Sequence, residues 1–100
     1  MILWWSIQSS LANPPTSYIR DRVLGCIFDD ETGLANRDRV GMELIAFETD
    51  YPHADSTFPK TKEVATTICE NAGLSEQEIY ALMRGNAIRA FGLSRWGIVE

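Results

Sequence analysis

Two short apolar runs constrain the fold of this chain more than any other feature. Residues 23–28 and 44–47 lack the polar alternation of a strand that has one face in water. Such continuous runs are typical of strands buried on both faces, as in parallel sheets. Helical patterns separate and follow them, which gives the order strand, helix, strand, helix, helix. This order predicts an α/β fold with parallel pairing and a right-handed crossover.

The helices between and after the strands are expected from apolar spacing and from end signals. Residues 34–40 are predicted to form a short helix that ends at Gly41. The next helix is expected over residues 59–72, because proline at position 59 is tolerated in a first turn. One of the polar residues 55–57 is expected to cap its start.

The last helix is expected over residues 76–91 and has the clearest start signal. Ser75 and Glu78 have the spacing of a capping box, in which each side chain satisfies a backbone amide at the helix start. Apolar residues keep helical spacing up to Gly92, where the helix stops. Asn86 interrupts this apolar stripe and is interpreted as a buried hydrogen-bonding residue.

The predicted sheet is too small to be complete. Two parallel strands need cover on both faces and a neighbour at each edge. A complete (β/α)₈ barrel takes about 250 residues, whereas this chain has 100. We therefore expect a single partial domain that belongs to something larger. Residues 1–20 are expected to be irregular, because Pro14 and Pro15 interrupt that segment.

Composition excludes several classes of partner. The formal net charge is −5, which argues against a nucleic-acid surface built from clustered Lys and Arg. No apolar stretch approaches the roughly 18 residues of a membrane span. Cys26 and Cys69 are far apart and are expected to be buried free thiols rather than a disulfide. These features predict a cytoplasmic protein.

The loop after the second apolar run carries the reactive side chains. In parallel α/β folds, such groups follow the carboxyl ends of strands. Side chains alternate along a strand, so Glu48 and Asp50 share a side with the small apolar residues before them. This pattern predicts an interior that becomes a polar pocket at its mouth. Asp29 and Asp30 follow the first run and are interpreted mainly as turn residues.

Two motifs resemble a known family. Residues 47–53, Phe-Glu-Thr-Asp-Tyr-Pro-His, precede Asp-Ser-Thr at 55–57, and residues 86–93 read Asn-Ala-Ile-Arg-Ala-Phe-Gly-Leu. In this order they are similar to the amidohydrolase-related family, in the branch that includes aminocarboxymuconate-semialdehyde decarboxylase. Residues 25–30 resemble the penultimate strand of these proteins. The resemblance covers about 14–93, which corresponds only to the last part of the family's barrel.

The resemblance implies a metal-dependent enzyme on a TIM-barrel-like fold. Residues 21–93 would be its last two βα units and C-terminal helix, and the chain a C-terminal fragment. Asp50 matches the aspartate that contacts the metal, usually zinc, and orients or deprotonates its bound water. His53 and Glu48 would contact that residue or the substrate. The reaction would be hydrolysis or non-oxidative decarboxylation, with a small molecule such as a carboxylic acid as substrate.

The chain departs from the family in its metal ligands. The family uses a His-x-His pair and further histidines, whereas this chain has one histidine. Catalytic zinc sites generally use three protein ligands. We therefore expect the metal to bind tightly only in the full-length enzyme, and the isolated chain to be inactive.

Other interpretations of the same residues remain open. Asp50 could instead form an Asx-turn before Tyr51 and Pro52. Glu48 could line the pocket or pair with an arginine. The alternative for the whole chain is a non-catalytic interaction module that self-associates through exposed strand edges, with a relic site loop. Self-association is expected under both hypotheses.

Overall fold

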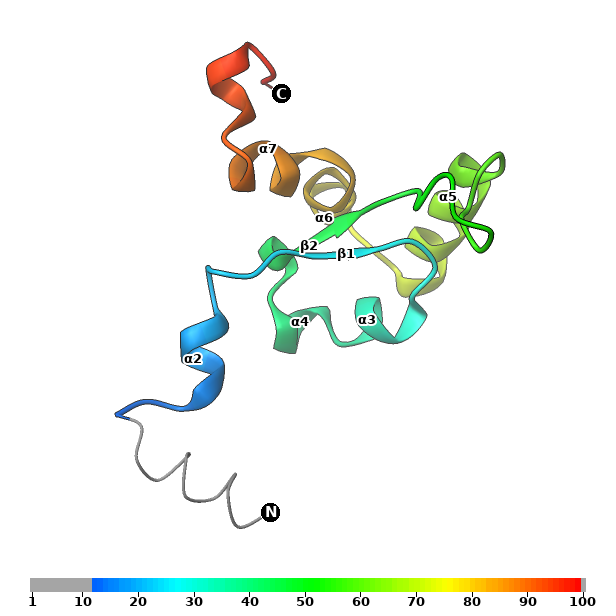
Figure 1. The fold of residues 1–100 in the computed structure, drawn as a ribbon. Helices are drawn as coiled ribbons and strands as arrows, with labels where there is room; N and C mark the ends of the chain where they lie inside the picture. Colours follow the sequence, from blue (N-terminus) through cyan, green and yellow to red (C-terminus); the bar gives the residue numbers. More distant parts are fainter. Residues whose placement is uncertain (1–11, 100) are drawn as a thin grey trace.

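The computed structural model describes residues 12–99 and has a two-stranded parallel sheet at its centre. Strand β1 (Gly25–Ile27) pairs with β2 (Ile45–Phe47), and Gly25 lies opposite Ile45. The predicted parallel pairing is confirmed, although both strands are shorter than the apolar runs. Because the strands are parallel, the segments that follow them leave from the same end of the sheet (Figure 1).

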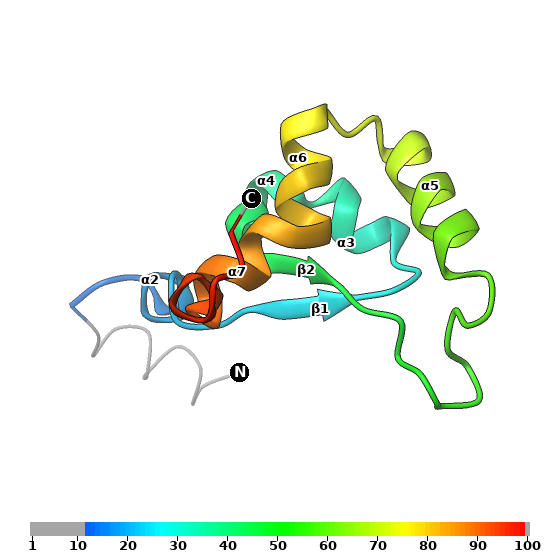
Figure 2. The ribbon, with the colours of Figure 1, turned by 90° about the horizontal axis from the view of Figure 1, so that it is seen from above.

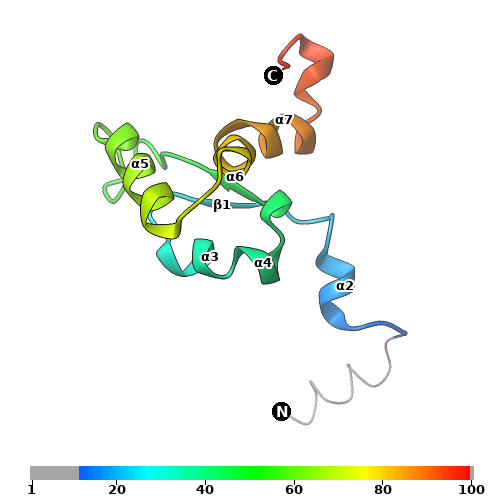
Figure 3. The ribbon, with the colours of Figure 1, turned by 180° about the vertical axis from the view of Figure 1, so that it is seen from behind.

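The helices lie on more than one side of the sheet. In Figure 1 and Figure 3, α3 (Glu31–Ala35) and α4 (Arg37–Val40) lie below the strands, whereas α6 (Glu76–Tyr80) and α7 (Asn86–Ala90) lie above them. Helix α5 (Thr61–Ala72) lies beyond the carboxyl ends of the strands, as Figure 2 also shows from above. The buried core between sheet and helices consists of Leu34, Ile45, Ile68, Cys69 and Leu82. The chain is thus a mixed structure of helices and a small parallel sheet.

The N-terminal segment differs from its prediction where it can be compared. Pro15–Ile19 form a short helix, α2, although residues 1–20 were expected to be irregular. Pro15 occupies the first helical position, where its fixed φ favours the helix. Residues 1–11 of the predicted irregular segment lie outside the described residues.

The first predicted helix has different bounds in the structure. It begins at Glu31 instead of residue 34, because the Asp30 carboxylate accepts a hydrogen bond from the Gly33 amide and caps α3. It is also interrupted at Asn36, after which α4 continues to Val40. Gly41 ends α4 with a φ of 104°, as expected from the sequence.

Helix α5 starts later than predicted. Pro59 lies before the helix, and Lys60 is the residue that precedes its first turn. No side chain caps this start, so the expected cap from residues 55–57 is wrong. The predicted stop is confirmed at Gly73, whose left-handed φ of 64° suits a residue without Cβ.

The last predicted helix is present but not uniform. The capping box of Ser75 and Glu78 forms as expected at the start of α6. The helix then passes through a π-helical turn, Ala81–Gly85, before α7 (Asn86–Ala90). A 3₁₀ helix, Leu93–Trp96, follows Gly92. None of the helices within residues 12–99 is long and apolar enough to cross a membrane.

The cysteines are free thiols, but only one is buried. Cys69 lies in the core, where burial raises the pKa of its thiol. Cys26 is exposed, so its predicted burial is wrong. It alternates along β1 with Ile27, which packs against the core, and therefore points to the opposite side of the sheet.

Candidate active-site loop

The loop from residue 48 to residue 60 leaves the carboxyl end of β2 and leads into α5. It extends beyond the strands in Figure 2. The Glu48 amide donates to the Ile27 carbonyl at 2.8 Å, so the loop starts directly after the last hydrogen bond of the sheet. Its base is closed by Thr57, whose amide donates to the Thr49 carbonyl at 3.1 Å. These two hydrogen bonds make residues 49–57 a closed loop at the carboxyl end of the sheet.

Thr57 joins the loop to the following helix as well. Its hydroxyl lies 3.3 Å from the Thr49 carbonyl and 3.0 Å from the Thr61 hydroxyl at the start of α5. Thr57 is buried, although its neighbours in the loop are mostly exposed. Sequence reasoning considered Thr57 only as a helix cap and missed this role.

Asp50 and His53 meet across a turn within this loop. The His53 amide donates to the Asp50 carbonyl at 2.9 Å, and the imidazole Nδ1 lies 2.8 Å from Asp50 Oδ1. The Asp50 backbone is left-handed, with a φ of 59°, a conformation that aspartate adopts more readily than most residues. The structure therefore brings together two of the three residues that the sequence singled out.

The contact leaves part of each side chain available. The Asp50 side chain is 23% exposed and the His53 side chain 73% exposed. Only one carboxylate oxygen of Asp50 faces the imidazole, so the second can accept a further proton or hydrogen bond. The Asp50 carboxylate contacts the His53 imidazole, whereas an Asx-turn requires that it bond a backbone amide.

The carboxylates of the loop raise the pKa of His53. The hydrogen bond to Asp50 contributes most, followed by the attraction between the two charges. Desolvation comes next in size and lowers the pKa, while Asp55 and then Glu48 add smaller contributions that raise it. His53 consequently stays protonated to higher pH than a free imidazole does.

Glu48 is placed near this pair without bonding it. Its side chain is exposed, and its charge is one of those that raise the pKa of His53. The salt bridges within residues 12–99 join Arg37 to Glu78 and His53 to Asp50. Neither includes Glu48, so the arginine pairing considered from the sequence does not form among these residues.

Two aromatic side chains of the same loop, Tyr51 and Phe58, contact each other. The rings of Tyr51 and Phe58 are 4.8 Å apart in an edge-to-face arrangement. Tyr51 is 63% exposed and Phe58 60%, although each is large and apolar. This pair could not be predicted from the sequence, because the two residues approach only when the loop closes at its base.

Asp30, one of the two carboxylates after β1, has a structural role. Asp30 caps α3 through the Gly33 amide at 2.7 Å, which agrees with the predicted turn role. Asp29 is exposed beside it. The candidate site residues that contact each other, Asp50 and His53, therefore both lie in the loop after β2.

The donors in residues 12–99 do not fit a complete metal site. No group of three or more His, Cys, Asp or Glu side chains in that range could hold an ion. Asp50 and His53 provide two donors, and the Nδ1 atom of His53 is already engaged by Asp50. A catalytic zinc site generally needs three protein ligands.

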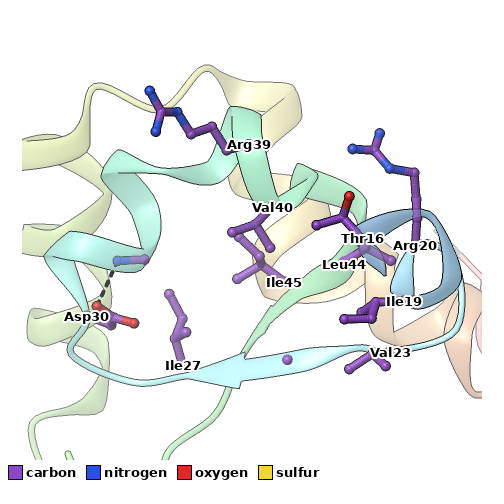
Figure 4. Close-up of a pocket in the computed structure, with 12 residues that line it drawn as sticks. Thr16, Ile19, Arg20, Val23, Ile27, Asp30, Arg39, Val40, Leu44 and Ile45 are labelled. Carbon is purple, nitrogen blue, oxygen red and sulfur yellow. Dashed lines mark hydrogen bonds between the residues drawn. The ribbon is translucent and has the colours of Figure 1, made fainter. Parts of the chain in front are cut away.

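A separate apolar hollow lies away from the site loop. It has a volume of about 460 Å³ and is bordered by α2, β1 and α4, with no residue of the loop in its wall. Figure 4 shows Ile19, Val23, Ile27, Val40 and Ile45 around it. Val23 and Ile19 are more than half exposed, so the hollow presents apolar surface to its surroundings.

Comparison with known proteins identifies the family. The comparison with curated proteins gave no significant match. The family model described as amidohydrolase matches residues 25–93, from the start of β1 to the residue after Gly92. The match spans the sheet, the site loop and the C-terminal helices, and covers more than half of the chain. This chain belongs to the amidohydrolase family.

Proposed function

We propose that this chain forms the last two βα units and the C-terminal helix of a metal-dependent barrel enzyme, with Asp50 as its catalytic residue. The observation that carries the proposal is the placement of Asp50 directly after a parallel strand, in contact with His53. In TIM barrels the reacting groups lie on loops at this end of the strands. The family assignment supports the same class of protein.

Asp50 is proposed to accept a proton from the attacking water. Its free carboxylate oxygen supplies the basic atom, and the imidazole at its other oxygen fixes the orientation of the carboxylate. His53 is thus a positioning residue on this proposal. Its positive charge also gives the loop a group that attracts a substrate carboxylate, and Glu48 lies within range to influence that charge.

The proposal assigns most of the metal site to residues outside 12–99. The resemblance implies a divalent metal, with zinc as the expected ion, and Asp50 would add one ligand to it. Such an ion lowers the pKa of its bound water. The reaction is proposed to be hydrolysis of a C–N or C–O bond or non-oxidative decarboxylation of a carboxylic acid. Free thiols fit the reducing cytoplasm as its location.

The proposal is tested by changing Asp50 in a protein that joins this chain to the remaining strands of a barrel. Asp50→Asn should lower kcat at least about a hundredfold, because general-base catalysis contributes roughly 10²–10⁴-fold. Metal content should fall much less, since other ligands hold the ion. Near-normal turnover with the metal retained would remove Asp50 from the mechanism.

A non-catalytic interaction module is the second candidate, and the apolar hollow favours it. Its wall contains half-exposed apolar side chains that a partner surface would cover. The coding frame upstream of Met1 separates the two candidates. An in-frame barrel with a His-x-His pair near its start supports the enzyme, whereas a promoter and a start codon at Met1 support the module.

A further inference from the structure

Three backbone carbonyl groups at and just before the start of β2 are bound by side chains of a single helix, α7. Asn86 Nδ2 donates to the Met42 carbonyl at 2.7 Å and to the Ile45 carbonyl at 2.8 Å. Arg89, one turn further along α7, donates to the Glu43 carbonyl. The two side chains thus hold the segment that enters β2 at three of its carbonyl groups.

The amide of Asn86 has all its main hydrogen-bonding groups engaged. Its two N–H groups bond the two carbonyls, and its Oδ1 accepts a bond from Arg89 Nη1 at 3.3 Å. Asn86 is 2% exposed, so water cannot replace these partners. A buried polar group is costly when it loses its partner, which makes this arrangement specific for one orientation of the amide.

A π-helical turn lies directly before Asn86, the residue that bonds β2. Ala81–Gly85 precede Asn86 directly, and a π-turn inserts extra backbone into a helix, commonly at functional sites. Leu82 of this turn is 1% exposed in the core, and Asn86 reaches the β2 backbone four residues later. The Tyr80 ring covers Gly85 closely, since a Cβ there would lie 2.6 Å from Tyr80 Cε1.

From these contacts we infer that Asn86 and Arg89 are positioning residues for Asp50. They fix the start of β2 at Ile45, and β2 has only three residues before the Glu48 amide makes the last bond to β1. Two residues later the chain reaches Asp50. Because β2 is short, contacts that hold its first residue also limit where its last residue can lie. Helix α7 therefore sets the position of the loop that follows β2.

The importance of this role for catalysis rests on the proposed function of Asp50, but the contacts can be tested separately. Hydrogen-exchange mass spectrometry on this chain compares peptides that cover β2 and Glu48 with peptides from α5. Arg89 is exposed, so its replacement is expected to leave the fold intact. Arg89→Met should speed exchange in the β2 peptides about tenfold through loss of charge-assisted bonds, with α5 little changed.

Controls separate positioning from a general loss of stability. Arg89→Lys retains a charged donor and should restore most of the protection of β2. Arg95→Met removes another exposed arginine, on the following 3₁₀ helix, and should leave β2 unchanged. Equal acceleration in β2 and α5, or no rescue by lysine, overturns the inference. If Asp50→Asn proves kinetically silent while exchange behaves as expected, only the proposed function fails.

Discussion

Asp50 combines a left-handed backbone with a side chain bonded to His53, so a substitution at this position can affect both the backbone energy and the contact. Asparagine tolerates a positive φ about as well as aspartate does. Asp50→Asn therefore removes the charge without adding strain at a φ of 59°. Alanine at this position would change backbone energy and charge together, and its effect on activity could not be assigned to the carboxylate.

The titration of His53 is a direct measure of its contact with Asp50. NMR should show a pKa above the ordinary 6.5 in this chain and a return toward 6.5 in Asp50→Asn. Asp55→Asn removes an equal charge without the hydrogen bond and should have a smaller effect. An identical shift in the two variants would mean that general electrostatics, rather than the contact, sets the pKa.

The sign of the effect on stability follows from the raised pKa. The folded chain binds the proton on His53 more tightly than the unfolded chain does. The contribution of the pair is therefore fully present below the unfolded pKa of about 6.5. It is lost as pH rises from about 6.5 through the raised folded pKa, so it weakens on the alkaline side of the ordinary pKa of histidine.

The sequence predicted that a polar loop follows the second strand but not the contacts within that loop. Asp50 could be selected because it follows a buried strand and lies in a recognisable motif. Its hydrogen bond with His53 depends on the left-handed φ at Asp50, which no periodicity reveals. Likewise, the pairing of Tyr51 with Phe58 depends on the closure of the loop at Thr57.

Among the helices, the predicted starts and stops are correct where the hydrogen bonds involve residues close in sequence. The capping box at Ser75 and the stops at Gly41 and Gly73 form as expected. Predictions failed where distant contacts decide. Thr57 bonds Thr49 and Thr61 instead of capping α5, and the π-turn at Ala81–Gly85 accompanies contacts with β2.

The capping box gives a stability prediction for α6. Ser75→Ala leaves the Glu78 amide without its acceptor and should lower the free energy of unfolding by about 1 kcal/mol. Urea denaturation measures the change. Ser94→Ala is the matched control, because only the backbone of Ser94 makes a hydrogen bond among those identified. Equal losses in the two variants would contradict the capping role.

For the molecule as a whole, parallel pairing was predictable and the uncovered surface follows from it. Continuous apolar runs require cover on both faces and a neighbour at each edge, yet the sheet within residues 12–99 has two strands, so each strand has one edge without a partner strand. The hollow between α2, β1 and α4 adds exposed apolar side chains. The position of this hollow was not predictable, because α2 itself was not expected.

Exposed apolar surface and unpaired strand edges should make the isolated chain self-associate. Sedimentation velocity should show species larger than the 11.2 kDa monomer, or the chain should bind an apolar dye strongly. Val23→Lys and Val40→Lys place charges in the hollow and should reduce association. A monodisperse monomer with sharp cooperative unfolding would contradict this expectation.

The central claim is that Asp50 performs the proton transfer and His53 positions it, and turnover of matched variants tests this most directly. In one protein that carries the complete barrel, kcat is measured for Asp50→Asn, His53→Ala and Asp55→Asn, with metal content determined for each. The account predicts the largest loss for Asp50→Asn, at least about a hundredfold, a smaller loss for His53→Ala and near-normal turnover for Asp55→Asn. Near-normal turnover of Asp50→Asn with its metal retained would contradict the account.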